Sequence, residues 1–111
     1  MTEAAPLPEI QVEELAERRR AGEAMTIVDV REDWEREIAS LPDTVNIPLA
    51  ALPGETGKLP HEGPLIVICR SGARSGRAVS WLHENGFGNA VNLAGGVLAW
   101  AARIDPSMRT Y

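Results

Sequence analysis

The one cysteine of the chain, Cys69, opens a short segment whose residue types suit sulfur chemistry. It follows the apolar run Leu65–Ile68, and an amphipathic stretch begins near Ser75, so the order predicts a buried strand, a tight loop and a helix. Such a thiol faces loop amides and a helix N-terminus. In these surroundings the pKa of a cysteine falls from ~8.5 to roughly 3.5–7.5. We therefore expect the nucleophilic thiolate to dominate at neutral pH.

The loop after the cysteine offers several groups that bind anions. A glycine and an alanine let the backbone curl, so that its N–H groups form an anion-binding nest. Two arginines can bind an anionic sulfur donor such as thiosulfate bidentately. Two serines supply hydroxyl donors, and the second is also expected to cap the following helix. The predicted substrate-binding loop consists of Arg70, Ser71, Gly72, Ala73, Arg74 and Ser75.

A second polar pair, Asp29 and Arg31, follows the β-branched run 26–28. Two interpretations remain open: a structural ion pair that anchors loops, or a secondary part of the site. His61 falls in a Gly- and Pro-rich stretch without a nearby partner, so we expect a surface histidine. Gly95 and Gly96 favour a tight turn from a strand into a helix.

Strands and helices alternate along the chain, which predicts an α/β fold with a small, mostly parallel β-sheet and helices on both faces. Parallel sheets bind ligands beyond the carboxyl ends of their strands, so residues 29–31, 69–75 and 94–96 should converge at one edge. We predict strands over 26–30, 44–47, 65–68 and 90–93, helices over 12–21, 31–39 and from Ser75 to about 85, a surface loop over 53–64 and a surface tail over 104–111.

Composition and charge narrow the function classes. With 111 residues and 44% hydrophobic residues, we expect a flexible N-terminal tail over 1–8 and a single domain over 9–111. The net charge of −5 argues against nucleic-acid binding, and no apolar run approaches the ~20 residues that cross a membrane. The N-terminal residues lack a signal-peptide pattern, and a single cysteine excludes an internal disulfide, so we expect a reducing cytoplasm.

Several motifs in order give the chain its resemblance to a known family. They are the segment Ile27 to Glu32, the segment Asn46 to Leu49, the loop that begins at Cys69, and the segment Asn92 to Trp100. From about residue 10 to 111, the chain resembles the rhodanese-like sulfurtransferases. The resemblance implies a rhodanese-like fold, a persulfide on Cys69, and a position for Arg31 near the active site.

The expected reaction has two steps. The Cys69 thiolate takes sulfane sulfur from a small donor, thiosulfate or a persulfide, and a nucleophilic acceptor then removes it, with no metal or organic cofactor. The segment 99–107 resembles the rhodanese domains of adenylyltransferase/sulfurtransferase proteins. That resemblance implies a sulfur-carrier protein, a cysteine desulfurase or an adenylyltransferase as partner.

Two other functions stay open. A rhodanese-like domain can serve as a docking or regulatory module, although the intact cysteine loop weakens this interpretation. Cysteine-based phosphatases and arsenate reductases are the rival enzymes. Phosphatase loops place an arginine six residues after the cysteine, whereas Arg74 stands at the fifth position and Ser75 at the sixth. The compact loop suits a single sulfur atom better than a tetrahedral anion.

Overall fold

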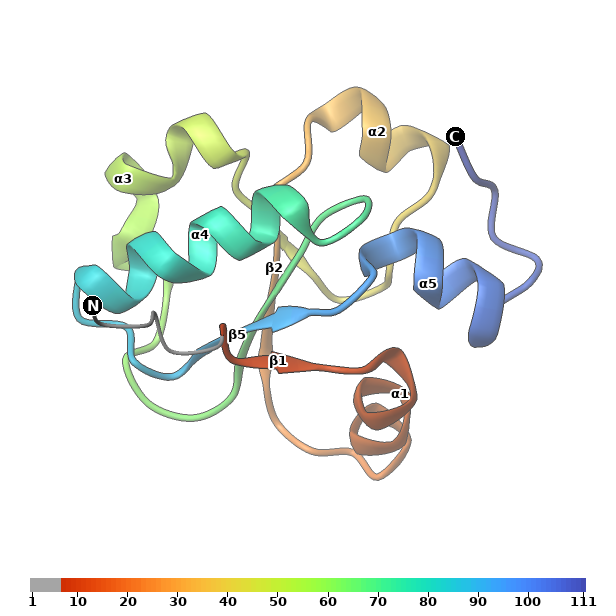
Figure 1. Ribbon diagram of the computed structural model, residues 1–111, viewed down its shortest axis with the longest axis horizontal. Helices are drawn as coiled ribbons and strands as arrows, with labels where there is room; N and C mark the ends of the chain where they lie inside the picture. The colour runs from red at the N-terminus through yellow and green to blue at the C-terminus, as the bar shows by residue number, and fades with distance from the viewer. Residues whose placement is uncertain (1–6) are drawn as a thin grey trace, which may run out of the picture.

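A parallel sheet forms the centre of the computed structural model, which describes residues 7–111 (Figure 1). Within these residues the sheet has five strands in the order β1-β5-β4-β2-β3. The strands are β1 (Glu9–Ile10), β2 (Thr26–Asp29), β3 (Val45–Asn46), β4 (Leu65–Ile68) and β5 (Ala90–Leu93). Every residue of the central strand β4 is buried, as its unbroken apolar run predicts for a strand covered on both faces. The predicted α/β architecture is confirmed.

Helices cover both faces of the sheet. They are α1 (Val12–Arg20), α2 (Asp33–Ile38), α3 (Leu52–Glu55), α4 (Ala73–Glu84) and α5 (Gly96–Arg103), with 3-10 turns η1 (Leu49–Ala51) and η2 (Thr56–Lys58). Alternate residues of each strand point to opposite faces, so Val67 packs in the core beneath α3 and α4. Its neighbour Ile66 packs in the second core, beneath α1 and α5. Figure 1 shows α3 and α4 on one side of the sheet and α1 and α5 on the other.

Three predictions of local structure are wrong. The helix predicted over 31–39 is α2, which begins two residues later at Asp33, because Glu32 forms a capping box with Glu35. The stretch 53–64 contains most of α3 and all of η2, because Pro53 stands in the first turn of a helix, where a proline has no intrahelical hydrogen bond to lose. Helix α4 begins at Ala73 rather than near Ser75, because Gly72 adopts a left-handed φ of 102° and turns the chain directly into the helix. Ser75 therefore lies inside α4 and does not cap it.

The predicted N-terminal tail lies largely outside the described residues, which begin at Leu7. Leu7 packs against the core under α4, and the carbonyl of Pro8 accepts a hydrogen bond of 2.8 Å from the N–H of Asn92. These contacts place the start of the described chain alongside β5.

The N-terminus of α5 holds the cysteine loop in place. The N–H of Val97 donates to the carbonyl of Cys69 at 2.9 Å, and the N–H of Leu98 donates to the carbonyl of Arg70 at 3.0 Å. Gly96 permits this close approach, because a Cβ there would lie 2.6 Å from the Arg70 carbonyl oxygen and closer still to that of Cys69. Its φ of 59° also lies in the left-handed region that favours glycine.

We expect Gly96→Ala to lower the free energy of unfolding by about 3 kcal/mol or more, because it adds a steric clash to the strain of positive φ. Gly22 has a φ of 75° with no atom within 4 Å of an added Cβ, so Gly22→Ala isolates the strain and should cost about 1–2 kcal/mol. Urea unfolding of both variants checks the difference. Equal losses would show that the contact between α5 and the loop contributes little.

Candidate active site

The sulfur of Cys69 lies in a cradle of hydrogen-bond donors at the carboxyl end of β4. The N–H of Gly72 donates to Sγ at 3.0 Å, and the Ser75 hydroxyl lies 3.2 Å from the same atom. Both donors belong to the first turn of α4 or the residue before it, so the positive end of the helix dipole also faces the sulfur. These groups are suited to stabilise negative charge on a sulfur atom at this point.

The cysteine at the centre of the cradle is buried, whereas part of the loop around it is exposed to solvent. Cys69 as a whole residue is 1% exposed, and Ser75 is fully buried. Ser71 and Ala73, by contrast, are exposed. Of the predicted loop residues, Gly72 and Ser75 contact the sulfur, and the two small residues 71 and 73 form the outer side of the loop.

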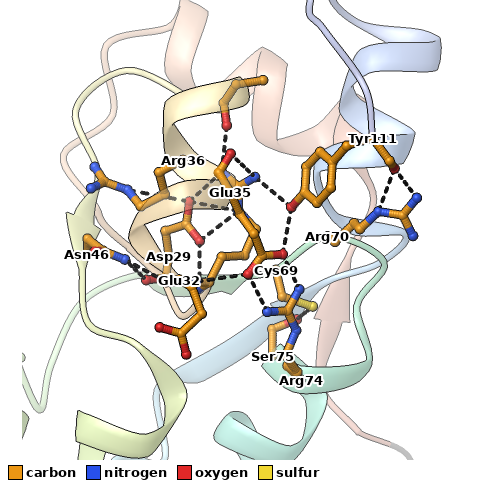
Figure 2. A network of polar contacts seen from close by, with 12 residues as sticks. Asp29, Glu32, Glu35, Arg36, Asn46, Cys69, Arg70, Arg74, Ser75 and Tyr111 are labelled. Carbon is orange, nitrogen blue, oxygen red and sulfur yellow. Dashed lines mark hydrogen bonds and ion pairs between the residues drawn. The ribbon is translucent and has the colours of Figure 1, made fainter.

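An ion pair between half-buried Arg74 and buried Glu35 ties α4 to α2 beside the sulfur. Both terminal nitrogens of Arg74 donate to the two carboxylate oxygens of Glu35 at 2.7 Å (Figure 2). The hydrogen bonds from Arg74 lower the pKa of Glu35 from 4.5 to about 2, against the opposing effect of burial. The same pairing raises the pKa of Arg74, to which the nearby Cys69 adds. Arg74 thus supports the wall of the site and has its guanidinium committed to Glu35.

Asp29 and Arg31 form a second ion pair, in which both side chains are fully buried. The Nη2 of Arg31 lies 2.8 Å from Asp29 Oδ2, and its Nε donates to Oδ1 at 3.0 Å. Burial alone would lower the pKa of Arg31, but hydrogen bonds with Asp29 and Tyr111 outweigh it and leave the pKa raised. The pair anchors the chain at the end of β2, which matches the structural interpretation.

Tyr111 joins the two ion pairs, although the tail 104–111 was expected only to cover the surface. Its hydroxyl donates to Glu35 Oε1 at 2.8 Å and accepts a hydrogen bond of 3.0 Å from Arg31 Nη1. Burial raises the pKa of this hydroxyl, the hydrogen bond from Arg31 opposes the rise, and donation to Glu35 adds to it. The Tyr111 main-chain oxygen accepts from Arg70 Nε at 2.7 Å, and Figure 2 shows the ring beside the loop.

Asn92 completes the cradle from the neighbouring strand β5. Its Oδ1 accepts from the Ser75 hydroxyl at 2.5 Å, and its Nδ2 donates to the carbonyl of Gly72 at 3.1 Å. The side chain therefore contacts both residues that reach the sulfur. It was recognised in the sequence only as part of a family-like segment, not as a site residue.

The site combines residues that the sequence predicted with residues that it did not. Cys69, its loop and Arg31 gather at one edge of the sheet, as the convergence of strand ends predicts. Glu35, Asn92 and Tyr111 complete the site and were missed. His61 lies on the surface as expected, where it stacks on Phe87 with ring centroids 4.0 Å apart.

Residues 7–111 hold neither a cluster of metal-ligating side chains nor a membrane-spanning helix. No three histidine, cysteine, aspartate or glutamate side chains in this part of the chain group closely enough to ligate a metal ion. Among the same residues, no helix has the length and apolar character that spanning a bilayer demands.

The Glu35–Arg74 pair predicts a specific acid sensitivity. Because folding lowers the pKa of Glu35, the pair stabilises the protein above about pH 4.5, and this contribution is lost as the pH falls towards about 2. We expect Glu35→Gln to cost about 2–3 kcal/mol at pH 7 and progressively less in acid, measured by chemical unfolding. Glu37, an exposed glutamate of the same helix, supplies the control Glu37→Gln. A penalty for Glu35→Gln that stays constant down to pH 2 would contradict the assignment.

Comparison with known proteins places the chain among sulfurtransferase relatives. It is 36% identical over 93 residues to a sulfurtransferase of Allochromatium vinosum, covering 84% of this chain and 87% of the relative. It is also 36% identical to adenylyltransferase and sulfurtransferase MOCS3 of Arabidopsis thaliana, covering 92% of this chain and 25% of that protein. The chain spans 40% of another Arabidopsis relative, the chloroplastic rhodanese-like/PpiC domain-containing protein 12.

The fold of the chain is also similar to that of a solved structure. The rhodanese-like domain protein of Staphylococcus aureus superposes with a TM-score of 0.80 at 31% identity, covering 85% of this chain and 91% of that one. The family profile described as rhodanese-like domain matches residues 11–103, which include β2, the cysteine loop and α5. On this match and the shared fold, the chain belongs to the rhodanese-like domain family.

Proposed function

We propose that this rhodanese-like domain is a sulfurtransferase that carries sulfane sulfur as a persulfide on Cys69. The observation that carries the proposal is the cradle around Sγ, where the Gly72 N–H and the Ser75 hydroxyl lie 3.0 and 3.2 Å away. An inert core cysteine needs no such donors, because a buried thiol packs as a small apolar group. Donors held at the sulfur favour chemistry in which this atom bears negative charge.

The first step loads the cysteine. The Cys69 thiolate attacks the outer sulfur of thiosulfate, a new S–S bond forms, and the S–S bond of thiosulfate breaks as sulfite leaves with the electron pair. In the second step, a nucleophile such as cyanide attacks the outer sulfur and forms thiocyanate, which regenerates the thiolate. Charge and atoms balance in both steps, and neither needs an external oxidant.

Arg70 is the better placed of the two loop arginines to meet the donor. Both terminal nitrogens of Arg74 donate to Glu35. Arg70 contacts Tyr111 through Nε and Nη2, so its second terminal nitrogen, Nη1, is the one assigned to the donor. Arg70 is also half-buried in the loop, directly after the cysteine. We therefore assign Arg70 to donor binding and Arg74 to support of the site.

The loop itself is the proposed route to the sulfur. Cys69 is 1% exposed, so a donor must reach Sγ past the small exposed residues Ser71 and Ala73. The loop also carries Ser75 at the sixth position after Cys69, where cysteine-based phosphatases place an arginine. This favours sulfur transfer over the phosphatase and arsenate reductase alternatives.

The relatives support a sulfur-carrier pathway as the setting. One of them carries the name adenylyltransferase and sulfurtransferase, and the chain covers a quarter of its length. We propose that the domain passes sulfur to a small carrier protein or receives it from a cysteine desulfurase, in concert with an adenylylating partner. A reducing cytoplasm is the proposed compartment, because the cycle requires a free thiol.

The test is the intact mass of the protein after incubation with thiosulfate. We expect the wild type to gain one sulfur atom and to lose it again when cyanide is added, because cyanide removes only the outer sulfur. Cys69→Ser should gain nothing, since the chain has no other cysteine.

Glutathione persulfide serves as a second donor in the same assay. Loading by this donor alone would retain the Cys69 persulfide and replace thiosulfate as the substrate. A protein that stays unmodified with both donors would overturn the proposal, and the docking-module interpretation would replace it.

A further inference from the structure

We infer that Asn92 is a positioning residue of the site, which sets the direction of the Ser75 hydroxyl at the sulfur of Cys69. The role in sulfur transfer rests on the proposed function. The hydrogen-bond chain itself is a property of the free thiol, so it can be tested without any sulfur donor.

The amide of Asn92 has one orientation that satisfies both of its neighbours. The side chain is 4% exposed on β5, so it has no alternative partners in solvent. The carbonyl of Gly72 can only accept, so the end of the amide that faces it at 3.1 Å must be the NH₂ group. The other end, Oδ1, is therefore an acceptor, and the Ser75 hydroxyl donates to it at 2.5 Å.

This orientation decides what the hydroxyl offers to the sulfur. Ser75 has one hydroxyl proton but two acceptors in reach, Asn92 Oδ1 at 2.5 Å and Cys69 Sγ at 3.2 Å. While the proton points to Asn92, Oγ presents a lone pair to the sulfur and can accept from a neutral S–H. When the sulfur is anionic, the same O–H bond rotates towards it, and Asn92 Oδ1 loses its donor.

Asn92 therefore competes with the sulfur for a single proton. With a neutral thiol, the S–H can donate to Ser75 Oγ while the hydroxyl donates to Asn92 Oδ1, so all three groups are paired. The hydroxyl keeps its proton throughout, and the thiol proton leaves to solvent when the sulfur ionises. Removing the acceptor on Asn92 should release the hydroxyl to the anionic sulfur, whereas removing the hydroxyl should deprive that sulfur of a donor.

The charged groups of the surrounding elements lie outside the Asn92–Ser75 chain. They are Arg74 of α4 with Glu35 of α2, Arg70 of the loop with Tyr111, and the Asp29–Arg31 pair at the end of β2. Because these groups are unchanged in variants of residues 75 and 92, a difference between such variants reports on the hydrogen-bond chain.

The experiment measures the rate of Cys69 alkylation by iodoacetamide across pH, since this neutral reagent reacts with the thiolate. Below the midpoint of the wild-type profile, we expect Asn92→Leu to react about threefold to tenfold faster and Ser75→Ala to react slower by a similar factor. The double variant should match Ser75→Ala, because Asn92 acts through the hydroxyl. The persulfide assay on the same proteins then measures the effect on sulfur loading.

Asn89→Leu is the matched control. Asn89 also donates from Nδ2 to two backbone carbonyls, those of Pro60 and Gly63, but it lies just before β5, at the opposite end from the site. Its variant should lose stability without changing the alkylation profile. If Asn92→Leu does not fold, Asn92→Asp keeps the acceptor, adds negative charge and should slow alkylation.

Three results would overturn the inference. Asn92→Leu could react at the wild-type rate or more slowly, which would mean that the side chain only holds the loop in shape. Alternatively, its effect could persist in the Ser75→Ala background, which would exclude action through the hydroxyl. Faster alkylation of Asn92→Asp would contradict it as well. Failure of sulfur loading in the wild type would instead count against the proposed function.

Discussion

The contact between α5 and the cysteine loop is the constraint on which the site depends. The first N–H groups of this helix bind the carbonyls of Cys69 and Arg70, and Gly96 has no side chain to keep them apart. With these carbonyls turned towards α5, the loop directs the N–H of Gly72 at the sulfur. The helix thus supplies the donors that its own N-terminus would otherwise leave unpaired, and the loop gains a fixed shape.

The charged side chains around the site, within residues 7–111, stabilise its shape and make no direct hydrogen bond with the sulfur. Arg31 and Arg74 each meet a buried carboxylate, so their positive charges are largely balanced within the protein. Leaving either charge unpaired in the interior would be costly, which explains why the partners come from neighbouring segments of the sheet edge. One backbone N–H, that of Gly72, and the Ser75 hydroxyl consequently make the direct contacts with Sγ.

The pattern of the sequence predicted the sheet and the cysteine loop because both depend on local signals. The unbroken apolar run of β4 and the small residues after Cys69 can be recognised from a few consecutive residues. Glu35 looked like one more acid in the first turn of α2, and its burial depends on Arg74, thirty-nine residues away. Tyr111 meets Arg31 across eighty residues, a contact that no local pattern encodes.

The errors at helix boundaries have a similar origin. Pro53 was interpreted as a loop residue, although the first turn of a helix accepts proline. Ser75 was predicted to cap the helix because serine favours the N-cap position. The N-cap of α4 is instead Gly72, three residues earlier. In both cases the residue type allowed two local structures, and the surrounding fold selected one of them.

A crystal structure of the protein after treatment with thiosulfate would test the central claim most directly, because it would show where the loaded sulfur lies. The cradle predicts an extra sulfur atom on Cys69 within hydrogen-bond distance of the loop N–H groups, with the carbonyls of residues 69 and 70 still bound by α5. An outer sulfur that points away from these N–H groups, or a loop that has left α5 to admit it, would contradict a preformed cradle.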